Sequence, residues 1–367
     1  MKHNLIALAV AAAVIAPVAN AAPKVYGKIN VTTENIKDDT KEQGRWEVLS
    51  NASRFGVKGE DELTATISAV YGVEWEVSAD GNSGTDMGQR NRFVGLKFQD
   101  IGTVKWGRYD SYTKLSQGEI DQFNDLSADM GKVMAGENRL NNVIGFESAK
   151  LMDAIQVNLM VLPGEQTTAK GTACNNCQNG LADGKSLSVI YNNEEMGLYA
   201  ALAFDKDISS KFNAVSSGAV GGAAASANTD ITRLVGSYDL KDTGLTVSAL
   251  YQMAERSDVE TINGVANVKP KETAVLVSAA YKLPVEGLKG KVQYAKNTTK
   301  FGDSMIKDVD VGQMSLGLDY KLSSKAKVFC YYTVLDYKNS NNPTVAASGK
   351  DDNWSVKNFG LGVEHKF

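Results

Sequence analysis

Hydrophobic and polar residues alternate with a period of two along most of the chain. In the segment 63–78 every odd position is apolar, whereas the even positions include Thr64, Glu74 and Glu76. Such strict alternation predicts a β-strand with one apolar and one polar face. Strands of globular sandwiches usually run about 5 or 6 residues. A strand as long as this one therefore indicates a different setting.

The alternating pattern recurs in segments that we expect to form sixteen β-strands. The predicted strands span residues 24–33, 45–59, 63–78, 89–99, 103–109, 139–148, 153–163, 184–193, 198–206, 229–240, 245–256, 272–283, 288–298, 311–322, 325–337 and 354–367. Short connections such as 58–62 and 322–325 alternate with long polar ones at 110–138, 164–183, 207–228 and 338–353. An even number of strands with short turns on one side and long loops on the other is typical of transmembrane β-barrels.

The last predicted strand ends on the last residue of the chain. Phe359, Leu361, Val363, His365 and Phe367 share one face of it. A barrel closes when its last strand pairs with its first, which leaves no open edge in lipid. The pattern therefore predicts an all-β fold, a 16-stranded antiparallel transmembrane β-barrel.

The N-terminus has the pattern of a cleaved signal peptide. Lys2 precedes an apolar stretch at residues 5–16, and Ala19-Asn20-Ala21 has the small residues of a cleavage site. We expect residues 1–21 to be removed and residues 22–367 to form the barrel domain. No later segment has the roughly 18 uncharged apolar residues of a membrane helix. The mean hydropathy of −0.24 also suits one or two soluble domains, so the periodicity has to decide.

Charge and cysteine content narrow the possible partners. Loss of Lys2 leaves 38 basic against 43 acidic residues, a net charge of about −5, so we expect no nucleic-acid partner.

Cys174 and Cys177 are expected to form a local disulfide in an external loop. A metal knuckle or redox pair is the alternative, but no second cysteine pair or nearby histidine completes it. Cys330 is interpreted as an apolar filler. We expect no metal and no cofactor.

Five short motifs, taken together, resemble those of the general bacterial porins, the trimeric diffusion porins of Gram-negative bacteria. The motifs are Val25-Tyr26-Gly27-Lys28, Ser53-Arg54-Phe55-Gly56-Val57-Lys58-Gly59-Glu60, Phe93-Val94-Gly95-Leu96-Lys97, Gly102-Thr103-Val104-Lys105-Trp106-Gly107-Arg108 and Arg139-Leu140-Asn141-Asn142-Val143. The resemblance implies an outer-membrane pore for passive diffusion of small hydrophilic solutes and ions. It also implies a homotrimer, contact with outer-membrane lipid and lipopolysaccharide, and insertion by the barrel assembly machinery, which reads Phe367.

The resemblance further implies that the third long loop, from about Tyr109 to Asn138, folds into the barrel and narrows it. Acidic residues on this loop would face a basic row on the opposite wall. The implied acids are Glu119, Asp121, Asp125 and Asp129, and the implied basic residues are Lys28, Arg54, Arg90, Arg92 and Arg139, with Arg92 added because it shares the parity of Arg90. The family's Pro-Glu-Phe-Gly-Gly turn is absent. Opposed rows of charge would set up a transverse field; the alternatives are rim charges and a solvated loop.

Several rival functions follow from the same sequence. An outer-membrane hydrolase with Ser-His catalysis needs a histidine, and His365 is the one left after cleavage, so we expect no enzyme; carboxylate-based catalysis stays open. A soluble periplasmic protein, a solute-selective porin and a non-conducting structural or adhesive barrel also compete with the diffusion porin. The negative charge favours a weak preference for cations. The sequence indicates neither a preferred solute nor a gating stimulus.

Overall fold

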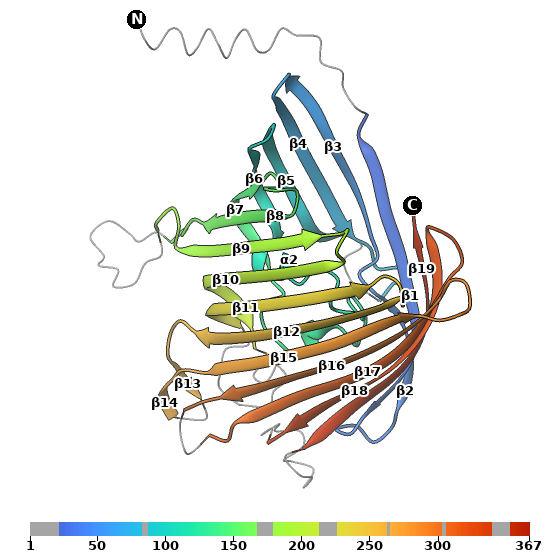
Figure 1. Cartoon of the computed structure of the whole chain (residues 1–367). Coiled ribbons are helices and arrows are strands. Elements are labelled where there is room, and N and C mark those ends of the chain that lie inside the picture. Colours follow the sequence, from blue (N-terminus) through green and yellow to red (C-terminus); the bar gives the residue numbers. More distant parts are fainter. Residues whose placement is uncertain are drawn as a thin grey trace, which may run out of the picture.

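The computed structural model describes residues 22–82, 87–166, 179–212, 226–262, 265–302, 306–339 and 353–367. The predicted signal peptide, residues 1–21, and the predicted disulfide between Cys174 and Cys177 lie outside the described residues. None of the described helices is long and apolar enough to cross a membrane. Most of the described chain is β-strand, arranged as one curved wall around a lumen (Figure 1).

The wall is a closed antiparallel sheet. Its strands are β1 (Lys24–Asp38), β2 (Arg45–Ser50), β3 (Arg54–Thr64), β4 (Ile67–Glu76), β5 (Gly88–Phe98), β6 (Gly102–Asp110), β7 (Arg139–Ser148), β8 (Ile155–Leu162), β9 (Gly184–Asn193), β10 (Leu198–Lys211), β11 (Ser226–Leu240), β12 (Leu245–Arg256), β15 (Lys271–Lys282), β16 (Leu288–Lys300), β17 (Val309–Lys321), β18 (Ala326–Lys338) and β19 (Trp354–Lys366). Two further strands, β13 (Glu260–Ile262) and β14 (Val265–Val268), form a separate hairpin.

Closure is made by β19, which pairs with β1 from Lys28↔Lys366 to Asp38↔Val356. Both β2 and β3 pair with β1, end to end. They are two parts of one strand, interrupted near Ala52, whose φ is +49°. The seventeen strands of the sheet therefore make a sixteen-stranded barrel, which confirms the predicted fold.

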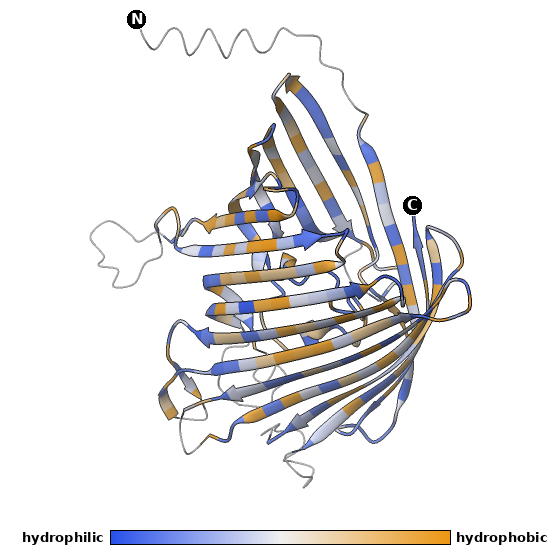
Figure 2. Cartoon of the chain, viewed as in Figure 1, coloured by the Kyte–Doolittle hydropathy of each residue, from blue (hydrophilic) through white to orange (hydrophobic). Residues whose placement is uncertain are grey.

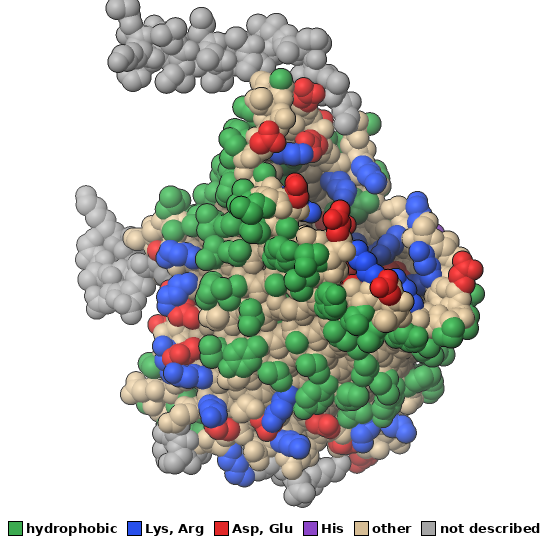
Figure 3. Space-filling view, in the orientation of Figure 1, with side chains coloured by type: hydrophobic (Ala, Val, Ile, Leu, Met, Phe, Trp, Pro, Cys, Tyr) green, Lys and Arg blue, Asp and Glu red, His purple; other side chains and the backbone are tan. Residues whose placement is uncertain are grey.

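The two faces of the wall differ as the alternation predicts. Leu361 and Val363 of β19, and Phe367 directly after it, are about half exposed on the outer face, whereas Gln293 and Asn297 of β16 face inward and are fully buried. Alternating bands of hydropathy run along the strands (Figure 2). On the face of the wall that Figure 3 shows, hydrophobic side chains predominate in the middle and charged ones gather toward the strand ends. Inside hydrocarbon, such a closed sheet satisfies every backbone hydrogen bond within the wall.

One predicted turn is wrong. Residues 58–62 belong to β3, and the chain reverses two residues after Leu63, at Ala65-Thr66, where Thr64 pairs with Ile67. A two-residue turn leaves the alternation of apolar and polar positions unbroken, so periodicity cannot locate it. The predicted loop 207–228 is also shorter, because β10 and β11 extend into it.

The segment between β6 and β7 folds into the lumen. It contains the short helix α2 (Tyr112–Leu115) and the 3₁₀ turn η1 (Met130–Lys132). Ile120, Met130 and Val133 are fully buried in a cluster with wall residues of β10 to β12 and β15 to β18. Phe123 packs with Phe329 and Tyr331 of β18. This inward-folded loop lies against one side of the barrel, as the resemblance implied.

Candidate pore constriction

Asp121 ties the inward loop to itself and to the wall. One carboxylate oxygen accepts hydrogen bonds from the Phe123 backbone N–H (2.9 Å) and from Nε2 of Gln293 (3.0 Å). The other accepts the Met130 N–H (2.9 Å). Burial and the nearby Asp129 raise the pKa of Asp121 to about 8. Asp121 was expected to face the pore, but the structure places it inside the loop, where its hydrogen bonds fix the loop's path and attach it to the wall.

A second anchor holds the end of the loop against β11, β12, β15 and β16. Glu272 accepts the Ala135 N–H (2.9 Å), and Nδ2 of Asn297 joins Glu272 (2.7 Å) to the Val133 carbonyl (2.7 Å). The buried guanidinium of Arg233 donates to the Thr113 and Ala135 carbonyls (both 3.0 Å) and pairs with Glu137 (2.9 Å). The sequence interpretation missed these wall residues. Polar residues at inward positions of the far strands were the signal that could have found them.

Asp125 carries the contact between the loop and the basic row. Its Oδ2 accepts from Nζ of Lys28 at 2.8 Å and forms an ion pair with Arg54. Burial opposes ionisation, but Arg54 and Lys28 outweigh it and hold the pKa of Asp125 below its usual range. Lys28 and Arg54 are direct cross-strand neighbours on β1 and β3, so one loop carboxylate bridges a pair of like charges.

The other two acidic residues of the predicted set do not reach the basic row. Asp129 accepts the backbone N–H groups of Asp125 (2.7 Å) and Gly131 (2.6 Å), so it fixes the loop's path and caps η1. Glu119 is exposed on the loop surface. We call the part of the loop around Asp125 its tip. Next to it, the Ser127 hydroxyl donates to the buried Glu34 of β1 (2.8 Å), and this hydrogen bond holds the tip close to the strand.

Arg90 and Arg139 lie on the inner wall but pair with acids of neighbouring strands. Arg90 contacts Glu74 at 2.5 Å and Glu76 at 3.1 Å, both on β4. Arg139 pairs with Asp110 at 3.1 Å. The expected row facing an acidic loop across open water is therefore, in the structure, a set of short ion pairs.

Arg92 lies on the outer wall, so the inference from its parity is wrong. Val73 pairs with Arg92, but Trp75 pairs with Gln89, so an extra residue of β5 bulges opposite Glu74 and reverses the faces. The Arg92 guanidinium lies over the outward ring of Trp75, 5.5 Å from its centre. Val94, which is apolar and exposed on the outer wall, has the same parity as Arg92, so the alternation after the bulge was the signal that could have placed Arg92.

The resulting constriction cluster contains four basic residues, Lys28, Arg54, Arg90 and Arg139, and four acids, Glu74, Glu76, Asp110 and Asp125. Its net charge is zero. Within the described part of the chain, no group of three or more His, Cys, Asp or Glu residues is arranged to hold a metal ion. Because the cluster lies inside the barrel beneath the inward loop, it can narrow a water-filled lumen and act on the charge of passing solutes.

Comparison with known proteins agrees with the barrel fold. A family model described as Gram-negative porin matches residues 7–343. The chain is 26% identical over 384 residues to the major outer membrane protein P.IB of Neisseria meningitidis, with 100% of both chains covered. The solved anion-selective porin from Comamonas acidovorans shares 17% identity and a TM-score of 0.67, over 94% of this chain and 99% of that one. The trimer form of OmpT, an outer membrane protein of Vibrio cholerae, shares 16% identity and a TM-score of 0.62, over 94% and 99%.

Proposed function

Because the chain belongs to the Gram-negative porin family, we propose that its selectivity is set where Asp125 meets Lys28 and Arg54. The protein is an outer-membrane porin, a channel through which small hydrophilic solutes and ions diffuse passively. The observation that carries the proposal is the bridging of two wall cations by a loop carboxylate inside the barrel. A charged contact in a narrowed lumen acts on ions at close range.

Equal numbers of opposite charges in the constriction cluster favour weak selectivity. The preference for cations inferred from the net charge remains a proposal, supported by the exposed Glu119 on the loop and by Glu76, whose side chain is half exposed. Removal of one charged side chain from the constriction cluster should then shift the ion selectivity of the channel in a defined direction.

Asp125→Asn should shift the channel toward anions, because Lys28 and Arg54 lose their shared carboxylate, and Arg54→Gln should shift it toward cations. The reversal potential of single channels in a KCl gradient measures both. Glu195→Gln, in the exposed turn between β9 and β10, is the matched control and should leave the potential unchanged. If Asp125→Asn and Arg54→Gln both behave like this control, the selectivity is set elsewhere.

The remaining features of the proposal concern assembly and export. We propose a homotrimer, supported by the trimer form named for one similar structure. Residues 1–21 would be the cleaved signal peptide, and the outward Phe367 would be read by the barrel assembly machinery. The outer wall would contact lipid and lipopolysaccharide. We propose no catalytic role, because the family relatives are named as porins and outer membrane proteins.

The trimer is open to a direct test. Purified protein kept unheated in mild detergent should migrate on a gel at about three times the apparent mass of the boiled subunit, and it should fall to that single subunit after boiling. Migration as a single subunit before heating would refute the trimer and leave the channel proposal standing.

A further inference from the structure

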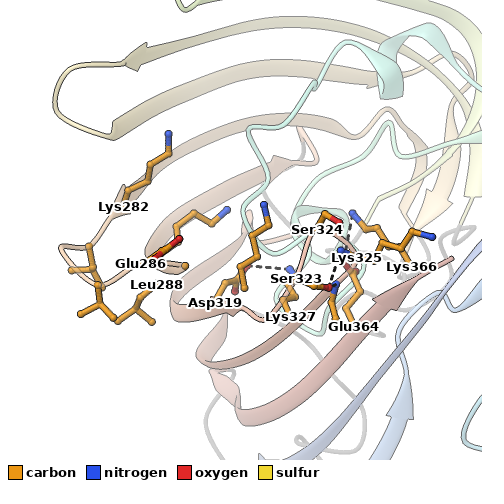
Figure 4. Close-up of a pocket in the computed structure, with 16 residues that line it drawn as sticks. Lys282, Glu286, Leu288, Asp319, Ser323, Ser324, Lys325, Lys327, Glu364 and Lys366 are labelled. Carbon is orange, nitrogen blue, oxygen red and sulfur yellow. Dashed lines mark hydrogen bonds and ion pairs between the residues drawn. The ribbon is translucent and has the colours of Figure 1, made fainter.

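A hollow of about 550 Å³ lies at the short-turn end of the barrel. It is formed by the turns 283–287 and 322–325, with the adjoining ends of β15 to β19 (Figure 4). Outer-membrane barrels place their short turns in the periplasm, so this is the periplasmic mouth. Its volume falls within the range of small-molecule sites, about 300–1,000 Å³.

The hollow is strongly basic. It is lined by six lysines, Lys282, Lys289, Lys321, Lys325, Lys327 and Lys366, and by three acids, Glu286, Asp319 and Glu364. We call the six lysines the lysine arc. Two of the acids are already shared: Asp319 pairs with Lys327 (3.0 Å) and Lys291 (2.8 Å), and Glu364 pairs with Lys28 (3.3 Å) and Lys366 (3.6 Å). The arc therefore keeps an excess of positive charge.

Two lysine pairs of the arc sit directly opposite each other across neighbouring strands. Lys282 of β15 faces Lys289 of β16, and Lys321 of β17 faces Lys327 of β18. Like charges in this arrangement destabilise a sheet. Among the described residues, Lys282, Lys289 and Lys321 make no ion pair with any carboxylate.

The constriction cluster shows how the same protein relieves such repulsion. There, the cross-strand pair Lys28 and Arg54 is bridged by Asp125. The pair Lys282 and Lys289 is likewise a direct cross-strand pair. Glu286, in the turn that joins their strands, forms no ion pair with either lysine in the described structure. A negatively charged group from outside the chain would complete the pair in the same way.

We propose that the lysine arc is a binding site for small multivalent oxyanions of the phosphate type, which enter from the periplasmic mouth. Lysine ammonium groups bind phosphate oxygens as point charges. Several of them around one hollow favour an anion with more than one charge over chloride. The lumen would thus retain such anions on one side of the constriction.

The test is current block by sodium pyrophosphate in single-channel recordings, with the anion added to one side of oriented channels. Wild-type current should be blocked at lower concentration from the short-turn side. The double variant Lys282→Gln with Lys289→Gln should need about tenfold more pyrophosphate for half block, and Lys282→Arg with Lys289→Arg should stay near wild type. The matched control is Lys271→Gln with Lys300→Gln, a lysine pair on the same two strands at the opposite end, which should not change the block.

Equal block of the wild type and the Gln double variant, or block from the long-loop side alone, would overturn the proposal. If the double variant fails to fold, Lys325→Gln in the exposed turn should show a smaller loss in the same direction, and no loss would count against the site. The proposal rests on the channel function, so calorimetric titration of the detergent-solubilised protein with pyrophosphate provides a second readout. Binding without current would contradict the channel, whereas current without binding would contradict the site.

Discussion

The constriction cluster and the lysine arc are neighbouring parts of one lumen that differ in how their basic residues are paired with acids. In the constriction cluster, each basic residue contacts an acid within 3.1 Å. In the lysine arc, six lysines lie beside three acids, and Lys282, Lys289 and Lys321 make no ion pair with a described carboxylate. Lys28 joins the two, since it pairs with Asp125 on one side and Glu364 on the other. The comparison shows that a like-charged cross-strand pair becomes a fixed structural contact when the chain provides a bridging carboxylate.

The difference has a physical origin in the surroundings of each region. The constriction cluster lies beneath the inward loop, where burial makes an unpaired charge costly. The lysine arc lies at the turn end, where Lys321 and Lys325 are exposed and water screens repulsion. Fixed ion pairs therefore lie where the side chains are buried, and unpaired charge is tolerated where the side chains are exposed to water.

The largest effect should come from releasing the loop that creates the difference. Asp121→Ala removes the acceptor for Phe123, Met130 and Gln293, so the tip should lose its position and Asp125 should leave Lys28 and Arg54. We expect a rise in single-channel conductance of about twofold, with noisier open current. Conductance equal to wild type would mean that the second anchor at Glu272 positions the tip by itself.

The contribution of Asp121 to the stability of the loop depends on pH with a definite sign. Burial raises the pKa of Asp121 to about 8, above that of a released carboxyl, so the folded loop gains stability from the bound proton at acidic pH. This contribution declines as the pH rises and is lost beyond about 8. Open-channel noise of the wild type should therefore increase with pH over this range, and Asp121→Asn, which cannot ionise, should not show the increase.

The sequence was sufficient for the barrel but not for the positions of individual charges. Alternation identified every strand of the wall, because the outer face must be apolar along its whole length. It missed the reversal at Ala65-Thr66, which leaves the alternation unbroken, and the bulge before Arg92, which shifts the alternation by a single residue. Asp121 and Asp125 are the same residue type four positions apart. Only the fold determines that one is buried in the loop and the other meets the wall.

The smallest effect should come from increasing the excess of positive charge in the lysine arc. Asp319 accepts from Lys291 and Lys327, so Asp319→Asn leaves two more ammonium groups without a carboxylate. The half-blocking concentration of pyrophosphate should fall about threefold, because the attraction of the arc for anions increases. Asp310→Asn, on the same strand near its other end and paired with Lys296, is the control and should leave the block unchanged. A weaker block in Asp319→Asn would mean that Asp319 positions the lysines for binding, because removing a purely compensating charge can only strengthen the attraction.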